Sequence, residues 1–320
     1  MKVVLCGTGF LGKNIARAMA DSALKSARPL QLQITSRNPQ RVHAELSGVV
    51  PGIMLLPPTS VDVTDPATLP PAFEDADVII SLVGVLRGSE ADFTKVQWKG
   101  AENVARVAKM FGAKVIHVSA IGADPSSTIP YARTKALAEA SILNICPDAT
   151  IVRPSIVFGP EDDFFNRFFR LSRYLPFLPV FGGGTTRFQP VFVGDVARAI
   201  DIMTRRDDQI QSMISGKIVE AGGPDIFTFR QLMELVLRFN GRKRPIVSIP
   251  FFMGAIQGAI MEQLPTNLFT LTRAQVDQLR LDNVVNPSPP SNHVSFASFI
   301  ESYSRTPLQS VYDVLPTYLE

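Results

Sequence analysis

The sequence has few of the residues that would make it a disulfide-stabilised or metal-binding protein. It contains 2 cysteines, Cys6 and Cys146, both in apolar stretches, and this is too few for a disulfide scaffold. We therefore expect two buried thiols of a reducing compartment. The 3 histidines are scattered without metal-ligand spacing, so we expect no metal site.

Long apolar runs and a strong charge imbalance are also absent. The most apolar stretch, residues 247–261, is interrupted by polar residues and proline, and it is shorter than the about 20 residues that span a bilayer. Because the first predicted strand begins at Lys2, we expect no targeting peptide before it in this sequence; the chain would stay where it is made, or its import signal would be internal or lie outside the sequence. The formal net charge is only +3, without a concentrated basic stripe, so no nucleic-acid partner is expected.

The first dozen residues contain the most informative pattern. The apolar strand candidate Lys2–Cys6 runs into a glycine-rich turn, and an amphipathic helical pattern follows to about Ser26. Between strand and helix, glycines in the pattern G-x-G-x-x-G allow a tight turn and the close approach of a pyrophosphate, which the helix N-terminus would bind. We therefore predict a dinucleotide site at Gly7, Thr8, Gly9, Phe10, Leu11 and Gly12.

Short apolar strands alternate with helical patterns over the first half of the chain. Because such strands indicate a parallel sheet covered on both faces, we expect an α/β fold. It would be a Rossmann-type doubly wound parallel sheet with a smaller, mainly helical C-terminal subdomain. The strand candidates are Lys2–Cys6, Leu30–Thr35, Ser60–Val63, Asp77–Leu82, Lys114–Ser119 and Thr150–Arg153, and helices are expected at Leu11–Ser26, Phe93–Phe111 and Tyr131–Ile145.

The second half predicts a less regular organisation. We expect residues 1–155 to form the nucleotide-binding domain, rejoined by residues 187–222, where strand and helix patterns return. Residues 156–320 would form the smaller subdomain with interleaved segments. The Pro- and Ser-rich stretch 286–293 reads as a linker, and the tail after it would dock as short helices.

The end of the second strand bears on the type of dinucleotide. A carboxylate about 20 residues after the fingerprint would bind the ribose 2′-hydroxyl of NAD. Here the strand ends in Ser36 and Arg37 without an acid, and Arg37 is placed to meet a 2′-phosphate. We therefore favour NADP(H), with NAD(H) as the alternative. After the third strand, Asp62 and Val63 would hold the adenine amino group, or Asp62 would only cap a turn.

Tyr131 and Lys135 form a second pattern at the start of the helix that follows the fifth strand. Residues four apart lie on one helix face, so the two side chains would be neighbours. The Lys135 ammonium would then lower the pKa of the Tyr131 phenol and make it a general acid/base near neutral pH. The same lysine could bind the nicotinamide ribose. The alternative is a surface Tyr–Lys pair on an amphipathic helix.

Two other segments each allow two interpretations. Residues 167–174 combine Arg167, Arg170 and Arg173 with aromatic residues, and they would contact anionic lipid or a partner, or cover a substrate cleft. The apolar segment 251–264 would be an interfacial anchor over residues 251–261, or ordinary core packing.

The chain resembles the extended, atypical short-chain dehydrogenase/reductase family in the order of its motifs. One branch is more similar: the nucleotide-binding accessory subunit of respiratory complex I and its bacterial and fungal relatives, among them a fungal mitochondrial protein connected with ubiquinone biosynthesis. The resemblance rests on the glycine-rich turn, Leu82-Val83-Gly84, residues 117–124, Tyr131 to Lys135, residues 151–162 with Pro154, and residues 187–191.

This resemblance implies a tightly held NADP(H), a mitochondrial matrix-side location (cytoplasmic for a bacterial chain), and partners in a respiratory or ubiquinone-biosynthesis membrane complex, with peripheral membrane contact. It adds Leu82, Val83, Gly84, Lys135 and Pro154 to the cofactor site. Tyr131, Lys135 and Ser119 would be the catalytic residues.

Three departures from the family pattern bear on activity. Cys6 replaces a glycine, Gln97 stands where Asn is frequent, and the catalytic hydroxyl position falls on Ser119 or on Ala120 or Ile121, which have none. Without that hydroxyl a substrate carbonyl lacks a hydrogen-bond donor. Three functions stay open: a structural or assembly component of the complex I machinery, an NADPH-dependent oxidoreductase acting on a quinone-like or carbonyl substrate, and a nucleotide sensor without chemistry.

Overall fold

The computed structural model describes residues 1–261, 270, 273–304 and 306–319. The chain divides into two units, each assembled from three segments. Unit 1 comprises Met1–Pro154, Val193–Ala221 and Pro287–Pro307; unit 2 comprises Ser155–Phe192, Gly222–Asn286 and Leu308–Glu320.

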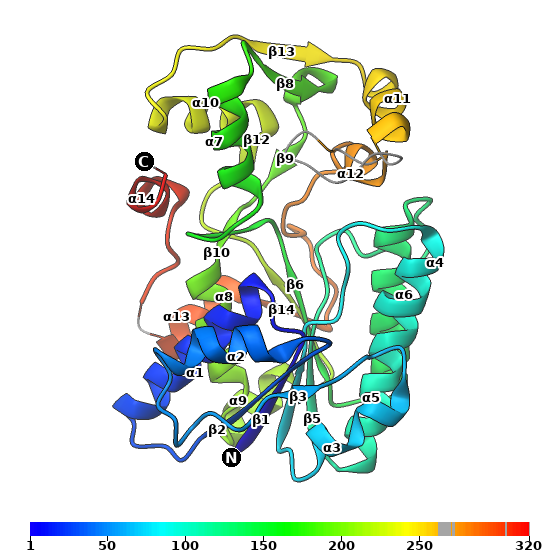
Figure 1. Cartoon of the computed structure of the whole chain (residues 1–320), viewed down its shortest axis with the longest axis vertical. Coiled ribbons are helices and arrows are strands. Elements are labelled where there is room, and N and C mark those ends of the chain that lie inside the picture. Colours follow the sequence, from blue (N-terminus) through cyan, green and yellow to red (C-terminus); the bar gives the residue numbers. More distant parts are fainter. Residues whose placement is uncertain (262–269, 271–272, 305, 320) are drawn as a thin grey trace. The chain divides into compact units, whose positions relative to one another are not determined.

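Unit 1 is built on a parallel sheet of eight strands in the order β3-β2-β1-β4-β5-β6-β11-β14 (Figure 1). The central strands consist almost entirely of buried residues, as expected for a sheet covered on both faces. The predicted doubly wound parallel sheet is therefore confirmed. The strands are β1 Lys2–Cys6, β2 Gln31–Ser36, β3 Thr59–Ser60, β4 Val78–Ser81, β5 Lys114–Val118, β6 Thr150–Pro154, β11 Ile218–Ala221 and β14 His293–Ser295.

Helices cover both faces of this sheet (Figure 1). One layer contains α1 Phe10–Lys25, α2 Pro39–Ser47, α8 Val193–Met203 and α13 Phe296–Ser304. The other contains α3 Pro70–Phe73, α5 Gly100–Met110 and α6 Pro130–Ile145. The short helix α9 Asp208–Ile214 follows α8 and precedes β11.

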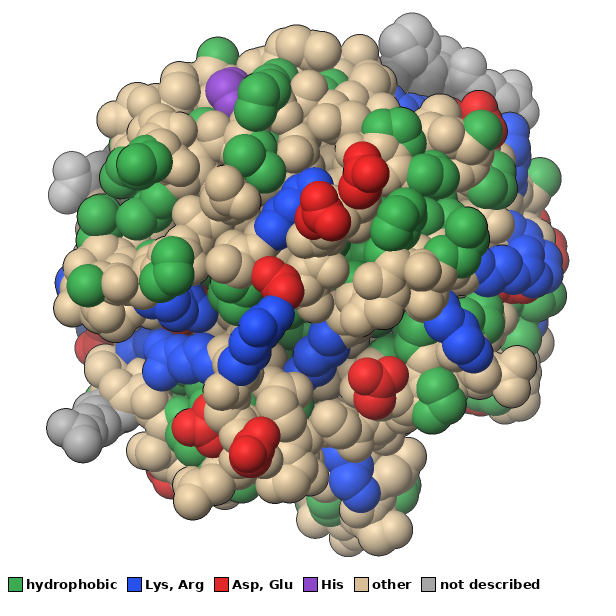
Figure 2. Space-filling model, turned by 90° about the horizontal axis from the view of Figure 1, so that it is seen from below, with side chains coloured by type: hydrophobic (Ala, Val, Ile, Leu, Met, Phe, Trp, Pro, Cys, Tyr) green, Lys and Arg blue, Asp and Glu red, His purple; other side chains and the backbone are tan. Residues whose placement is uncertain are grey.

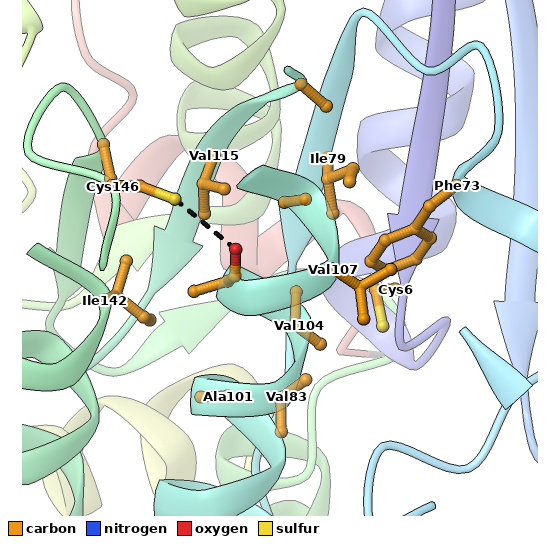
Figure 3. Close-up of a cluster of buried hydrophobic side chains, with 14 of the residues drawn as sticks. Cys6, Phe73, Ile79, Val83, Ala101, Val104, Val107, Val115, Ile142 and Cys146 are labelled. Atoms are coloured by element: carbon orange, nitrogen blue, oxygen red, sulfur yellow. Dashed lines mark hydrogen bonds between the residues drawn. The ribbon is translucent and has the colours of Figure 1, made fainter. Parts of the chain in front are cut away.

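Both cysteines belong to the apolar core between the sheet and the second layer of helices (Figure 3). Neither forms a disulfide, and both are buried, so the expected buried thiols are confirmed. The Cys146 thiol donates a hydrogen bond of 3.5 Å to the Ala105 carbonyl. Burial raises the pKa of the Cys6 thiol to about 12, so the thiol stays protonated at neutral pH.

Two elements of unit 1 differ from their predicted form. The single helix expected over Phe93–Phe111 begins with a turn of α-helix, α4 Glu90–Asp92, and then a π-helix, η2 Phe93–Lys99, before α5 starts at Gly100. The third strand contains only Thr59 and Ser60, so Asp62 and Val63 lie in the following turn. A hydrophobic pattern does not separate a π-helix from an α-helix, because both bury one side of the segment.

The two units differ from the expected division in two segments. Residues 187–192 were expected in the nucleotide domain, but their strands pair within unit 2: β9 Arg187–Phe188 with β12 Phe227–Thr228, and β10 Val191–Phe192 with β7 Val157–Phe158. Residues 287–307 were expected in the smaller subdomain, but they lie in unit 1, because β14 extends the sheet beside β11.

Unit 2 has its own apolar core, which also includes the end of the chain. Val311, Leu315 and Leu319 are buried in this core, and the Tyr318 hydroxyl donates a 2.6 Å hydrogen bond to Asp162. The last residues of the expected docking tail therefore pack within their own unit. The other described α-helices and strands of unit 2 are α7 Phe164–Tyr174, β8 Leu178–Phe181, α10 Phe229–Phe239, β13 Ile246–Ile249, α11 Phe251–Met261, α12 Arg273–Gln278 and α14 Val311–Val314. Residues 262–264 of the expected apolar segment lie outside the described residues.

Charged side chains of both signs are interspersed with apolar ones on the face shown in Figure 2. Exposed ion pairs of the protein include that of Arg187 with Asp282, at 2.7 Å. In the part of the chain that the structure describes, no helix has the length and apolar character needed to cross a membrane.

Candidate dinucleotide site

The glycine-rich turn joins β1 to α1, and its three glycines differ in what surrounds them. Gly7 has φ +98°, a conformation that favours glycine, and a Cβ there would lie 3.2 Å from the Leu82 carbonyl oxygen. A Cβ on Gly12 would lie 2.8 Å from the Gly7 carbonyl oxygen. Gly9 is exposed, with open space around it, at the N-cap of α1. Gly7 and Gly12 therefore allow close packing, and Gly9 leaves the helix N-terminus accessible to an anion.

The turn also explains how Cys6 can stand where the family pattern has a glycine. Cys6 is the last residue of β1 and its side chain is buried in the core, so the sharp change of direction falls on Gly7 instead. The Gly7 amide continues the sheet pattern by donating to the Thr35 carbonyl at 3.0 Å. Phe10 and Leu11 are half-buried in the first turn of α1.

Four buried polar atoms at or near this end of the sheet lack a hydrogen-bond partner among the described residues. They are Thr8 Oγ1, Gln97 Oε1, His117 Nε2 and Ser119 Oγ. Buried polar atoms without partners are uncommon, because each costs about 1–3 kcal/mol. Thr8 and Ser119 follow the carboxyl ends of β1 and β5, where doubly wound folds bind ligands. These atoms fit a bound polar ligand such as a dinucleotide.

Lys135 lies on α6 beside the loop after β4. Its ammonium donates to the carbonyl oxygens of Val118 at 3.0 Å and Val83 at 3.3 Å, and it would lie 3.1 Å from a Cβ on Gly84. Burial lowers the pKa of Lys135 to about 8, and the negative charge of Glu139 partly opposes this shift. Lys135 therefore joins the ends of β4 and β5, the two strands nearest the predicted nicotinamide position.

Tyr131 lies one turn before Lys135, and the electrostatic prediction for it is wrong. The ring is half-buried and packs edge-to-face on Phe93, with centroids 6.0 Å apart. Burial raises the pKa of Tyr131 to about 12, and Lys135 produces no opposing shift. The reason is that the Lys135 ammonium is directed at backbone carbonyls. The helical spacing predicts which side chains share a face, but not where the ammonium points.

Ser119, the first residue after β5, is the one of the three candidate positions that has a hydroxyl. The Ser119 amide donates to the Val152 carbonyl at 2.7 Å, and its Oγ is one of the four unpartnered atoms. Ile121 donates its amide to the carbonyl of Pro154, the last residue of β6, at 3.0 Å. Ser119 is thus the buried hydroxyl of the three candidate positions, and its catalytic role stays a prediction.

The predicted adenine end of the site lies after β2 and β3. Ser36 ends β2, and Arg37 follows it with an exposed side chain. The Asp62 carboxylate accepts hydrogen bonds of 2.9 Å from both the amide and the hydroxyl of Thr64. These bonds lower the pKa of Asp62, and the charge of Arg37 contributes. Asp62 therefore caps a turn, one of its two expected roles; the contacts of Arg37 and Asp62 with a nucleotide stay predictions.

Two side chains in this region form hydrogen bonds that the sequence patterns do not predict. Gln97, in the π-helix, donates from Nε2 to the Tyr131 carbonyl and to Thr134 Oγ1, each at 2.9 Å. Glu139 accepts a two-bond contact from Arg153, at 2.9 and 2.6 Å. The available sequence signal for Glu139 is its spacing of one helical turn from Lys135.

Comparisons with known proteins agree with this geometry. The sequence profile of the NAD dependent epimerase/dehydratase family matches residues 3–222. NADH dehydrogenase (ubiquinone) 1 alpha subcomplex subunit 9, a mitochondrial protein of Arabidopsis thaliana, is 33% identical over 295 residues, which cover 88% of this chain and 70% of that protein.

Solved structures with low sequence identity share the fold. A dTDP-glucose 4,6-dehydratase from Streptomyces venezuelae with NAD bound superimposes with a TM-score of 0.70 at 18% identity, covering 100% of this chain and 96% of that one. A triphenylmethane reductase from Citrobacter sp. complexed with NADP(H) has a TM-score of 0.69 at 16% identity, covering 99% and 100%. The residues that the family profile matches include the glycine-rich turn, Tyr131 and Lys135. The chain belongs to the NAD dependent epimerase/dehydratase family, in the branch similar to the alpha subcomplex subunit 9 of mitochondrial NADH dehydrogenase.

Proposed function

We propose that this chain is a mitochondrial NADP(H)-binding component of the respiratory complex I machinery, in which the dinucleotide has a structural role. The observation that carries the proposal is a contrast between the polar atoms that would bind a ligand and the two residues that would carry out catalysis. Polar atoms at the carboxyl ends of the strands lack partners and fit a ligand, whereas Tyr131 has a pKa of about 12 and Lys135 is bonded to backbone carbonyls. A bound dinucleotide stabilises such a site by mass action without turnover. The similarity to subunit 9 supports the location and the partner.

Preference for NADP(H) over NAD(H) is part of this proposal. It is supported by Arg37, the exposed cation that follows β2, and by the lack of an acid at the end of that strand. Guanidinium groups bind phosphate through paired hydrogen bonds, so Arg37 suits a 2′-phosphate. When bound, the nicotinamide would supply hydride chemistry; the roles of Gly9, Thr8 and Lys135 would be to hold and orient it.

One observation favours a second function, an NADPH-dependent oxidoreductase that acts on a carbonyl or quinone-like substrate. Ser119 Oγ is buried without a described partner, and Tyr131 and Lys135 are both retained on α6. In this function Ser119 would donate a hydrogen bond to the substrate oxygen and Tyr131 would transfer a proton. The high pKa of the Tyr131 phenol suits a proton donor better than a base at neutral pH.

The test uses protein purified without added nucleotide. Mass spectrometry of the denatured protein identifies any retained dinucleotide, and the absorbance of reduced nicotinamide is then followed while carbonyl and quinone substrates are added. Retained NADPH that no substrate oxidises supports the structural role. Oxidation that the Tyr131→Phe variant abolishes, with unchanged folding and nucleotide content, establishes the oxidoreductase instead. Protein without nucleotide and without affinity for it overturns both functions.

A further inference from the structure

Unit 1 has an open cavity of about 480 Å³ in the helix layer that contains α1, α8 and α13. Helix α8 packs against both α1 and α13 on one face of the sheet (Figure 1). Small residues on the facing helices, Ala18 and Ser22 of α1 and Gly194 of α8, line the cavity and leave space between the helices. We name this space the α1–α8 cavity.

The α1–α8 cavity lies away from the glycine-rich turn. On α1 its lining begins at Ala18 and continues to Ser26, whereas the dinucleotide is expected at Gly9, the N-cap of this helix. At the usual rise per residue, Ala18 is about 14 Å and Lys25 about 24 Å along the helix from Gly9. A molecule bound in this cavity would therefore be an additional ligand.

Two buried carboxylates of α8 hold arginines around the cavity. Asp201 accepts hydrogen bonds from Arg28 at 2.6 Å and from Arg205 at 3.0 Å, and Asp195 accepts one from Arg198 at 2.6 Å. The carboxylates are 3% and 2% exposed. Each guanidinium group has five N–H donors, so these pairs fix the arginines in place and leave most of their donors available.

The polar groups around the cavity include donors that lack an acceptor. Arg198 Nε, Arg28 Nη1 and Ser304 Oγ are buried and have no hydrogen-bond partner among the described residues, and Arg198 and Ser304 line the cavity. The backbone carbonyls of residues 22–24 and 200–203, in the last turns of α1 and α8, already accept bonds. The α1–α8 cavity therefore suits a ligand that supplies acceptor atoms.

The charge around the cavity points to the same kind of ligand. Asp21, an exposed carboxylate of the lining, lies one helical turn before Lys25 on the same face of α1, an order in which an acid and a base stabilise each other. One positive charge remains, because the charged residues that line the cavity or pair with its lining are the cations Lys25, Arg28, Arg198 and Arg205 and the carboxylates Asp21, Asp195 and Asp201.

We propose that the α1–α8 cavity binds a small organic molecule that carries an oxyanion, a phosphate or a carboxylate group. Guanidinium groups bind such groups through paired hydrogen bonds, so Arg198 and Arg205 would hold the oxyanion, with Ser304 as a further donor. The organic part would lie against Ile202 and Tyr303, which also line the cavity. The volume is within the range of about 300–1,000 Å³ of small-molecule sites and larger than an inorganic ion needs.

The experiment is titration calorimetry of the full chain, with and without saturating NADPH. The probes are glucose 6-phosphate, citrate, inorganic phosphate and uncharged glucose. We expect one of the two organic anions to bind with a dissociation constant below about 1 mM, more tightly than inorganic phosphate and more weakly as salt is added. Glucose should not bind. Tighter binding of glucose 6-phosphate assigns the oxyanion as phosphate, and tighter binding of citrate assigns it as carboxylate.

Two variants place the bound anion in the α1–α8 cavity. Ser22→Phe fills the space without a change of charge, and we expect it to weaken binding by about tenfold or more. Lys25→Gln removes a cation of the lining and leaves the buried carboxylates paired, and we expect a loss of about three- to tenfold. The matched controls are Ser212→Phe on α9 and Lys109→Gln on α5, at exposed positions. Circular dichroism establishes that all four variants are folded.

The inference goes beyond the proposed function, because it concerns the C-terminal half of α1 and holds whether or not a dinucleotide binds at the turn. Oxyanion binding by a protein without affinity for NADPH supports it and overturns the dinucleotide function alone. Three results overturn the inference: no probe binds more tightly than about 10 mM, the controls lose as much affinity as the cavity variants, or NADPH displaces the anion while Ser22→Phe has no effect. The last result assigns the anion to the glycine-rich turn.

Discussion

The side-chain amide of Gln97 donates a 2.9 Å hydrogen bond to the backbone carbonyl of Tyr131 and so joins the π-helix η2 to the first turn of α6. The carbonyl oxygens of a first helical turn normally accept from amides further along the helix, so this is an additional bond. It comes from a fully buried residue. π-Helical segments are frequent at functional sites, and here the segment directs Gln97 toward the residues expected to carry chemistry.

The Gln97→Met variant tests this contact. Met has a similar volume but no donor, so two hydrogen bonds are lost, and we expect the free energy of unfolding to fall by about 1–3 kcal/mol. Urea unfolding followed by circular dichroism measures it. The exposed Gln209→Met is the control and should change it by less than about 0.5 kcal/mol. Equal stability of the Gln97 variant and wild type would show that the contact is not needed.

Substitutions of Gly9 and Gly12 should affect different properties, dinucleotide affinity in the first case and stability in the second. A Cβ on Gly12 would lie 2.8 Å from the Gly7 carbonyl oxygen, so Gly12→Ala should lower the free energy of unfolding by about 1–3 kcal/mol. Gly9 has open space, so Gly9→Ala should preserve stability but weaken dinucleotide affinity, because the methyl group obstructs the helix N-terminus. Thermal unfolding and titration calorimetry measure the two effects. Unchanged affinity in Gly9→Ala would contradict a dinucleotide at this turn.

Arg37 should determine nucleotide selectivity. The Arg37→Glu change replaces the exposed cation after β2 by an anion, so we expect NADPH affinity to fall by about ten- to a hundredfold while NADH affinity changes little. Lys109→Glu on α5 is the control for the change in net charge. Calorimetric titration with NADPH and with NADH measures the two affinities. If NADPH affinity were unchanged, the assignment of Arg37 to the 2′-phosphate would fail.

Lys135 should give the protein a measurable pH dependence of stability. Its pKa is about 8 in the folded protein and 10.5 in the unfolded chain, so folding releases a proton between these values. The contribution of this group to stability therefore rises with pH from about 8 to 10.5. The free energy of unfolding of wild type minus that of Lys135→Met should increase by about 2–3 kcal/mol over this range. Other titrating groups cancel in the difference; a constant difference would mean that Lys135 is not buried.

Tyr318 should hold the end of the chain in unit 2. In Tyr318→Phe the buried Asp162 loses its 2.6 Å hydrogen bond, and we expect a loss of about 1–3 kcal/mol in stability. The control is Tyr174→Phe, since Tyr174 is 73% exposed. Limited proteolysis should also cleave the variant earlier near residue 308, where the segment of unit 2 begins. Identical cleavage of variant and wild type would contradict the anchoring role.

Most of the sheet and the glycine-rich turn could be predicted from sequence because both depend on local patterns. The strand Lys2–Cys6, the turn at Gly7 and the following helix lie within a few residues of one another. The strand β14 could not be predicted, because three residues contain too little pattern and its place depends on pairing with β11. The pKa of Tyr131 was predicted in the wrong direction, because burial is a property of the packed protein. The contacts of Gln97 and Glu139 depend on packing between helices and strands in the same way.

The order of segments along the chain has a consequence for biosynthesis. The sheet of unit 1 takes its last strand from residues 293–295, after the ribosome has already made most of unit 2. The first six strands in sequence can pair early, but the outer edge of β11 stays uncovered until β14 emerges. Exposed strand edges promote aggregation, so a nascent or truncated chain lacking residues 287–307 would present an open β-edge to neighbouring chains.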